Sequence, residues 1–354
     1  MMMNNKLFRP FLYVVMLVTL MAAYSAVSAQ DATPEVTPEP TEEAATQTSG
    51  DALPDRVVVS SEGLFPEGVE YDTLNQRFLV SSTADGMVRT VADDGTLEVL
   101  VADDRLPPSI GIEADEASNR LLVAATDMKM KGFLGIYDLT TGENIHLVDF
   151  RPLTPTDPEH FINDVAVDSQ GNAYVTDSYA GVIFRVDPQG NASIFLEDES
   201  FSTQFTLNGI VYHEVGNFLI AVQMPYLIKI PLENPAVFAR INVAQLFPGA
   251  DGLVLLNENT LVVVTNNPAK VFRLETEDAF ASAVVTGIFE TGNVNPTTAA
   301  VRDGEAYVLY AQLNAEEQTI TDFPIQRVMF EAPPAAEDPV AEAPETEPTP
   351  EVTP

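Results

Sequence analysis

Cysteine and tryptophan are both absent from this chain of 354 residues, and basic side chains are scarce. The lack of cysteine excludes disulfides, thiolate metal ligands and a cysteine nucleophile. Lys and Arg together number 17 against 53 Asp and Glu, which gives a formal net charge of −36. Because phosphate contacts need clustered Lys and Arg, this balance argues against a nucleic-acid partner. Stability has to come from an apolar core, with or without a bound metal.

Helical periodicity is also nearly missing between residues 56 and 330. Few windows place apolar residues at i, i+3, i+4 and i+7, whereas short β-rich runs recur roughly every 8–12 residues. The chain contains no serine nucleophile elbow, no zinc-ligand spacing and no phosphate-binding glycine loop. The missing motifs exclude several common catalytic sites. The β-rich runs, with few helical windows between them, indicate an all-β protein.

The N-terminus has the composition of an export signal. Residues 1–29 combine a short basic start, an apolar segment from Phe11 to Ala23 and a small-residue cleavage site at Val27-Ser28-Ala29. The sequence therefore predicts a secretory signal peptide, with an uncleaved anchor as the alternative. We expect a secreted, cell-surface or periplasmic protein that is not inserted in a membrane after cleavage.

Two acidic segments flank the rest of the chain. Residues 30–55 and 332–354 are rich in Pro, Thr, Glu and Ala and contain no Lys or Arg, and TPEVTP occurs in both. Such segments bury too little apolar surface to offset the entropy of ordering, so we expect disordered tails. They could tether the protein to a cell surface as spacers, or act only as solubilising tails. The folded domain is then residues 56–331.

Six similar phrases recur through that domain. Each begins with a turn-like start and continues into a short apolar run, a polar corner and a second apolar run. The residue before the first run forms a column with intervals of 43, 53, 45, 43 and 46 residues. Periods of about 40–50 residues with several strands per unit are typical of propeller blades. The column consists of Glu67, Ile110, Asn163, Asn208, Asp251 and Thr297.

The strand pattern within a unit gives the number of strands per blade. The first unit contains four β-rich runs separated by polar corners: Val69–Tyr71, Phe78–Ser81, Met87–Ala92 and Leu97–Val101. The fold expected is an all-β, six-bladed β-propeller with four antiparallel strands per blade. We expect Arg56–Ser60 to join the last blade and close the ring, because closure leaves no sheet edge open.

Four of the six column residues carry oxygen ligands. Glu67, Asn163, Asn208 and Asp251 should all point at the channel axis, since the first strand of each blade lines the channel. Two carboxylates and two amide carbonyls suit a hard cation, so we expect a divalent cation with Ca²⁺ favoured and Mg²⁺, Zn²⁺ or Mn²⁺ as alternatives. The plainer interpretation is that Asn and Asp before Gly are ordinary turn residues.

His160 is a second candidate catalytic residue. It ends the proline-rich connection Arg151–His160, which we interpret as a lip over the channel mouth, and lies three residues before Asn163. From there it could shuttle a proton to or from a water in the site. The alternative is an ordinary surface histidine.

The same phrases resemble those of the gluconolactonase/regucalcin (senescence marker protein) family of six-bladed propellers. The resemblance covers about residues 57–330 and rests on Glu67, Asn163-Asp164, Asn208-Gly209 and Asp251-Gly252. It implies that Glu67, Asn208 and Asp251 hold a divalent cation and that Asn163 lies beside it, facing substrate. It also implies that Asp251 is the general base.

One position departs from that family. The sugar-lactone hydrolases have an Arg two residues before the Asn, where this chain has Phe161. An aromatic ring cannot donate hydrogen bonds to sugar hydroxyls, so we expect a more apolar small-molecule substrate, bound by Asn163, Phe161 and Tyr226.

These observations lead to three hypotheses. The first is a secreted, metal-dependent hydrolase of a lactone or ester. The second is a non-catalytic propeller stapled by its ion, which binds a ligand or protein at the mouth. The third is an enzyme similar to strictosidine synthase, a branch of propellers that does not depend on a bound metal. Fold alone does not choose among them.

Overall fold

The structure is a computed structural model, and six stretches of it are described: residues 53–127, 131–154, 159–201, 206–292, 294–313 and 320–334. The predicted signal peptide, residues 30–52 of the N-terminal linker and residues 335–354 of the C-terminal tail lie outside the described residues. Within those stretches, no helix has the length and apolar character needed to span a membrane.

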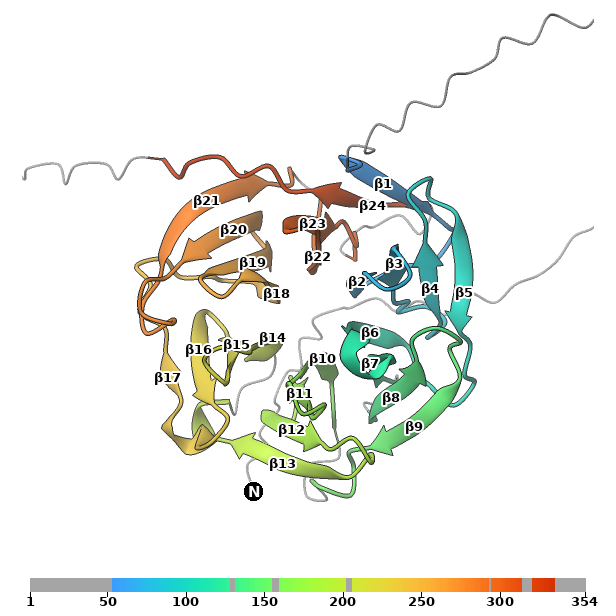
Figure 1. Ribbon diagram of the computed structural model, residues 1–354, viewed down its shortest axis with the longest axis horizontal. Coiled ribbons are helices and arrows are strands. Elements are labelled where there is room, and N and C mark those ends of the chain that lie inside the picture. Colours follow the sequence, from blue (N-terminus) through green and yellow to red (C-terminus); the bar gives the residue numbers. More distant parts are fainter. Residues whose placement is uncertain are drawn as a thin grey trace, which may run out of the picture. The chain divides into compact units, whose positions relative to one another are not determined.

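Six four-stranded antiparallel sheets surround a common centre (Figure 1), which confirms the predicted six-bladed β-propeller. The innermost strands are β2 (Val69–Asp72), β6 (Ser109–Asp115), β10 (Ile162–Val167), β14 (Leu207–His213), β18 (Ala250–Asn257) and β22 (Ala299–Arg302). The second strands are β3 (Arg77–Val80), β7 (Arg120–Thr126), β11 (Ala173–Asp177), β15 (Phe218–Gln223), β19 (Thr260–Asn266) and β23 (Glu305–Leu309).

The outer half of each sheet completes the blades. The third strands are β4 (Val88–Val91), β8 (Gly132–Asp138), β12 (Val182–Val186), β16 (Tyr226–Pro231), β20 (Ala269–Glu275) and β24 (Asp322–Arg327). The outermost strands are β5 (Leu97–Val101), β9 (Asn144–Asp149), β13 (Ala192–Glu197), β17 (Ala239–Arg240), β21 (Val284–Glu290) and β1 (Arg56–Ser60). In the part of the chain that the structure describes, three single-turn 3₁₀ helices lie in connections, at Glu116–Ser118, Glu199–Phe201 and Pro235–Val237.

The first strand of the chain closes the ring, as the sequence predicts. Strand β1 pairs with β24 along its whole length, from Arg56 opposite Gln326 to Ser60 opposite Asp322. Blade six therefore takes three strands from the end of the domain and one from its beginning. This pairing holds the two ends of the domain together without a disulfide.

Apolar side chains fill the spaces between neighbouring blades. Each inter-blade cluster draws buried residues from both sheets that it joins, as where Leu122 and Leu134 of blade two pack with Val165 and Val175 of blade three. In the same cluster the rings of Phe150 and Phe184 stack with centroids 4.4 Å apart. Because strand side chains alternate between the two faces, the short apolar runs in the sequence supply both layers of this packing.

A β-bulge interrupts the innermost strand of four blades at the column residue. In β10, Ile162 pairs with Asp177 and the next pair is Val165 with Val175, so two residues oppose one. A bulge re-aims the side chains within it. The same register shift recurs at the column residues of the other three strands, Ile110, Asn208 and Asp251.

Glycine after the column residue permits close approach of neighbouring inner strands. A Cβ on Gly209 would lie 2.3 Å from the carbonyl oxygen of Asp251, which no real Cβ tolerates. Glycine follows the column residue in four blades, but blade three has Asp164 there. The carboxylate Oδ2 of Asp164 accepts a hydrogen bond of 3.0 Å from the backbone N–H of Ile210.

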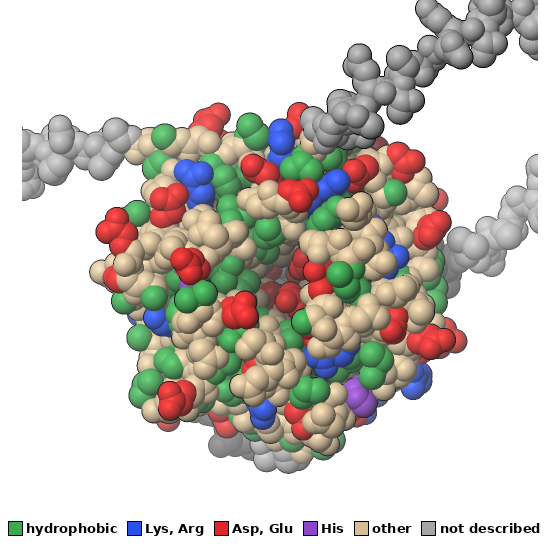
Figure 2. All heavy atoms as spheres, viewed as in Figure 1, with side chains coloured by type: hydrophobic (Ala, Val, Ile, Leu, Met, Phe, Trp, Pro, Cys, Tyr) green, Lys and Arg blue, Asp and Glu red, His purple; other side chains and the backbone are tan. Residues whose placement is uncertain are grey.

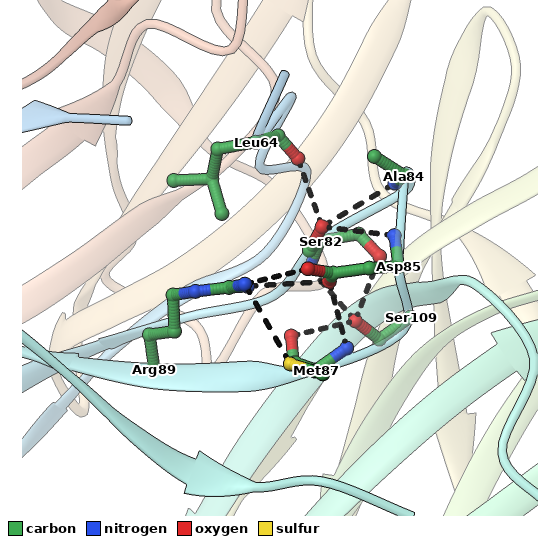
Figure 3. A network of polar contacts seen from close by, with 7 residues as sticks. All are labelled: Leu64, Ser82, Ala84, Asp85, Met87, Arg89 and Ser109. Carbon is green, nitrogen blue, oxygen red and sulfur yellow. Dashed lines mark hydrogen bonds and ion pairs between the residues drawn. The ribbon is translucent and has the colours of Figure 1, made fainter. Parts of the chain in front are cut away.

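Buried serines tie the loops at the ends of the second strands to the next blade. Figure 3 shows Ser82, whose hydroxyl donates to the carbonyl of Leu64 at 3.0 Å. The carbonyl of Ser82 in turn accepts hydrogen bonds from the backbone and the hydroxyl of Ser109, the first residue of β6. This network fixes the start of the second inner strand relative to the first blade.

Candidate functional site

The inner strands enclose a cavity of about 200 Å³ in the central channel. Acidic side chains are visible in the central hollow of the space-filling view (Figure 2). Glu67, Asn163, Asn208 and Asp251 all line this cavity, so the fold brings together the four oxygen-bearing residues selected from the sequence. They come from four different blades and are separated by up to 184 residues of chain (251 − 67).

Asp251 is held by two amides. Its side chain lies in the bulge of β18 and is almost fully buried. Oδ2 accepts a hydrogen bond of 3.2 Å from Nδ2 of Asn266, and the Asn208 side chain also hydrogen-bonds to this carboxylate. Burial raises the pKa of Asp251 to about 7 despite these two bonds, and the nearby carboxylate of Asp164 adds to the increase.

Glu67 is fixed through its backbone. The hydroxyl of Ser81 accepts hydrogen bonds from the N–H groups of Glu67 and Gly68, at 3.3 and 2.7 Å. The hydroxyl of Thr297 donates to the Glu67 carbonyl at 2.6 Å. Removal from water raises the pKa of the Glu67 carboxyl well above its usual range, and the carboxylates of Asp251 and Asp164 raise it further. Two hydroxyl groups thus anchor the backbone of an acidic residue that has no basic neighbour among the described residues lining the cavity.

The two asparagines are positioned by hydroxyl groups. Nδ2 of Asn163 donates to Oγ of Ser178 at 2.9 Å. The backbone carbonyl of Asn208 accepts from Oγ1 of Thr176 at 2.8 Å. Both asparagines are buried, and both lie in strand bulges that face the cavity.

Sequence reasoning missed three further carboxylates of the cavity, namely Glu70, Glu113 and Asp164. Burial raises the pKa of Glu70 to about 8 and that of Asp164 to about 6, and it raises the pKa of Glu113 well above the usual value. The sequence contains a signal for two of them, because Glu70 and Glu113 each lie three residues after the column residue of their own blade, and these two blades are adjacent. Asp164 stands where four blades have glycine.

The charge of the cavity is unbalanced. Of the described residues that line it, five are Asp or Glu and none is Lys, Arg or His. A group of like-charged carboxylates removed from water favours either protonation or a bound cation. Among the described residues no three His, Asp or Glu side chains are arranged to hold a metal ion by themselves. The donor set that fits a cation is therefore the mixed one, with Glu67 and Asp251 as carboxylates and Asn163 and Asn208 as amides.

His160 does not line the cavity. We expected it on the lip within reach of the site, but its side chain is fully buried, with both ring nitrogens occupied. Nδ1 lies 2.6 Å from Oδ2 of Asp177, and Nε2 lies 3.1 Å from Oγ1 of Thr154. The buried ring thus links Thr154 to Asp177 of β11, and it does not face the cavity.

Phe161 and Tyr226 also lie outside the cavity lining. Phe161 directly precedes β10, is half-buried and has its ring 6.1 Å from that of Tyr179. Tyr226 begins β16, and the guanidinium of Arg240 lies 3.7 Å from its ring centroid. Both residues are near strand ends rather than in the channel, so any contact with a ligand would be made above the cavity.

Comparison with solved structures finds many chains of similar fold. Mala s 1, the major allergen of Malassezia sympodialis, aligns with a TM-score of 0.68 at 20% identity, covering 78% of this chain and 97% of that protein. A calcium-binding regucalcin from Agrobacterium tumefaciens aligns with a TM-score of 0.57 at 17% identity, covering 78% and 94%. A luciferin-regenerating enzyme aligns with a TM-score of 0.55 at 11% identity, covering 78% and 97%.

At these identities the likeness concerns the fold. No protein-family model matches the chain, and no curated protein matches its sequence. The expected gluconolactonase/regucalcin resemblance is therefore supported at the level of propeller architecture, in which a regucalcin is one of several neighbours.

Proposed function

We propose that the protein is a divalent-cation-dependent hydrolase of a lactone or ester, with Ca²⁺ as the preferred ion. The observation that carries this proposal is the convergence of Glu67, Asn163, Asn208 and Asp251 on one acidic cavity, whose described lining includes no basic side chain. The fold neighbours add support, since one is described as calcium-binding and another as a luciferin-regenerating enzyme.

The chain's own residues suit this cation. Glu67 and Asp251 supply two negative charges and the amides of Asn163 and Asn208 supply neutral oxygens, a donor set typical of Ca²⁺. Ca²⁺ takes about 6–8 oxygens, so four protein ligands leave positions for a substrate oxygen. When bound, the ion would polarise the carbonyl of the ester or lactone.

We assign the proton transfer to Asp251, whose buried carboxylate lines the cavity and would accept a proton from an attacking water. The water oxygen then bonds to the carbonyl carbon, the ester C–O bond breaks, and the departing alkoxide takes the proton back from Asp251. Asn266 and Asn208, which both hydrogen-bond to this carboxylate, would hold it in place during the transfer.

The dimensions of the cavity constrain how a substrate binds. Pockets for drug-sized ligands usually enclose about 300–1,000 Å³, and this one encloses about 200 Å³. Only the reacting carbonyl would enter the cavity, and the rest of the substrate would lie above it near Phe161 and Tyr179. That aromatic pair favours an alkyl or aryl ester or lactone over a sugar lactone.

The small cavity also supports the second hypothesis, a propeller whose ion only staples the channel. Such a protein would be stabilised by Ca²⁺ and would bind a ligand or partner at the mouth without turnover. Both hypotheses include the cation site, and they differ in whether the protein turns over a substrate. Export through residues 1–29 stays a prediction in either case.

The two hypotheses are separated by assaying the full chain on a panel of aliphatic and aryl lactones and esters. Turnover is measured with Ca²⁺, with chelator, and in Glu67→Gln and Asp251→Asn. Under the hydrolase proposal, chelator abolishes turnover, and each variant loses about 100-fold or more in kcat/KM, since each removes a charged group that acts on the transition state.

Glu305→Gln is the matched control, because Glu305 is an exposed acidic residue of β23 and does not line the cavity. Its turnover should equal that of the unaltered protein. Thermal stabilisation by Ca²⁺ with no turnover of any substrate would instead support the stapled propeller and reject the hydrolase.

A further inference from the structure

The side-chain amide of Asn163 is held against a single buried serine. Asn163 is only 5% exposed and Ser178 only 1% exposed, and Asn163 Nδ2 lies 2.9 Å from Ser178 Oγ. Ser178 directly follows β11, and its backbone N–H donates to the carbonyl of Phe161 at 2.9 Å. The serine is therefore fixed by its backbone beside the bulge that carries Asn163.

The proton on Ser178 is already committed elsewhere. Ser178 Oγ lies 2.6 Å from the backbone carbonyl oxygen of Leu207, the first residue of β14. A carbonyl can only accept, so the one hydroxyl proton of Ser178 must point at Leu207. Toward Asn163, the serine oxygen can then only accept a hydrogen bond.

This proton count fixes the orientation of the Asn163 amide. With Nδ2 toward Ser178 the contact is a good hydrogen bond. With the amide reversed, two oxygens would face each other at the same distance with no proton between them, and a buried polar pair of that kind is strongly disfavoured. The carbonyl oxygen of Asn163 is consequently turned away from Ser178, and it is the one acceptor that this side chain can offer to the cavity that the residue lines.

The orientation decides what Asn163 can bind. An amide that offers its oxygen to the cavity can ligate a cation, whereas one that offers its NH₂ group would repel a cation and could only donate to a substrate oxygen. The other hydroxyls around the site bond to main-chain groups of the candidate ligands, as Ser81 does at Glu67 and Thr176 at Asn208. Ser178 differs because it bonds to a ligand's side chain.

We propose that Ser178 is a positioning residue that commits the side-chain oxygen of Asn163 to the cation site. The inference rests on the proposed function, because it assumes that a divalent cation occupies the cavity. It assigns Asn163 to the cation rather than to a hydrogen-bond donor role toward substrate.

Calorimetric titration of the full chain with Ca²⁺ tests the inference directly. Residues that orient metal ligands typically change affinity about 10- to 100-fold when removed, and we expect a loss in that range for Ser178→Ala. Ser178→Thr keeps the hydroxyl and should restore binding to within a few-fold of the unaltered protein.

Ser82→Ala is the matched control. Ser82 is equally buried and donates to a main-chain carbonyl, but it contacts none of the four candidate ligands. The Ca²⁺ affinity of this variant should equal that of the unaltered protein.

A second measurement follows the amide itself. In protein labelled with ¹⁵N at asparagine, the side-chain NH₂ signal of Asn163 is assigned by its loss in Asn163→Asp. Its proton bonded to Ser178 should exchange slowly with solvent in the unaltered protein. Rapid exchange would overturn the inference even if Ser178→Ala failed to fold.

The results of these experiments distinguish the role of Ser178 from the proposed function. Ca²⁺ binding that is equally tight in Ser178→Ala and the unaltered protein overturns the role of Ser178 and leaves the proposed function standing. No Ca²⁺ binding by the unaltered protein rejects the proposed function and with it the assignment of Asn163 as a cation ligand. Weakened binding in Ser178→Ala, together with a slowly exchanging amide in the unaltered protein, supports both.

Discussion

Asp177 shows how one buried carboxylate can organise the entrance to the site. Its Oδ1 accepts hydrogen bonds of 3.0 Å from the backbone N–H groups of Phe161, Tyr179 and Ala180, and its Oδ2 contacts His160. These bonds tie the end of the lip and the loop after β11 to one side chain. Because Asn163 and Ser178 lie just beyond those anchors, Asp177 also sets where the Asn163 amide lies.

Asp177→Ala should therefore destabilise the protein. The substitution leaves several buried donors without an acceptor, which costs about 1–3 kcal/mol for each unsatisfied group, so we expect a loss of at least ~2 kcal/mol. The measurement is chemical unfolding in urea. Asp187→Ala is the control, because Asp187 also accepts three hydrogen bonds but in an exposed turn where water can replace it. Equal losses in the two variants would contradict the organising role of Asp177.

The geometry of the inner strands depends on the bulge and on the glycine that lies within it. In β14 and β18 the column residue and the glycine after it stand opposite one residue of the neighbouring strand. The bulge directs Asn208 and Asp251 to the cavity, and the glycines let the two strands approach each other closely. At Gly209 the backbone conformation is one that alanine can adopt, so the constraint there is the missing side chain and not the dihedral angle.

Gly209→Ala tests this at the level of the strand. The added Cβ would lie 2.3 Å from the carbonyl oxygen of Asp251, so β14 and β18 must separate. We expect the free energy of unfolding to fall by roughly 2–3 kcal/mol, in the range of overpacked cores, together with weaker Ca²⁺ binding, measured by thermal unfolding and calorimetry.

In the control Gly304→Ala the new Cβ meets no atom within 4 Å, and only the positive φ of 79° is unfavourable. That change should cost about 1–2 kcal/mol and leave Ca²⁺ affinity unaltered. Unchanged Ca²⁺ affinity in Gly209→Ala would show that the strand spacing does not define the site.

At the scale of the whole ring, the propeller concentrates carboxylates where their charge is hardest to solvate. Glu70 and Glu113 come from adjacent blades and face the same cavity as Glu67, Asp164 and Asp251. Burial is the largest reason that the pKa of Glu70 rises from 4.5 to about 8, and Glu113 shifts in the same direction. Since the folded pKa exceeds the unfolded one, protonation of these groups favours the folded state.

The free energy of unfolding should consequently depend on pH in the absence of divalent cations. The contribution of Glu70 and Glu113 is fully present below about pH 4.5 and is lost as pH rises through about 8. In chelator we expect the melting temperature to fall by on the order of 5 °C between pH 5 and pH 8, since ~1 kcal/mol corresponds to about 2–4 °C in a domain of this size. Added Ca²⁺ should reduce that fall by supplying the missing positive charge.

Two variants separate this effect from the general repulsion of an acidic protein. Glu70→Gln combined with Glu113→Gln should flatten the pH dependence, whereas Glu98→Gln on the exposed face of β5 should not. A dependence that is equally steep in both proteins would mean that the channel carboxylates do not control it.

Much of the fold could be predicted because blade structure is local in sequence. The run at Leu97–Val101 is a strand with the predicted bounds. The bounds at the channel were less predictable. Asn163 was expected just before the inner strand of blade three, but β10 begins at Ile162. The reason is the bulge, which hides Asn163 and Asp164 inside a strand although their sequence reads as a turn.

The sequence alone determined the six-fold repeat, the closure of the ring by β1, and the oxygen-bearing residues that occupy the same position in each repeat. These features follow from the local alternation of apolar and polar residues and from the recurrence of similar phrases along the chain. Only the tertiary structure decided which side chains share the channel. It added Glu70, Glu113 and Asp164 to the cavity, turned His160 into the blade beside Asp177, and put Ser178 against Asn163. Burial and the direction of a hydrogen bond depend on how neighbouring blades meet, and no stretch of a single blade encodes that.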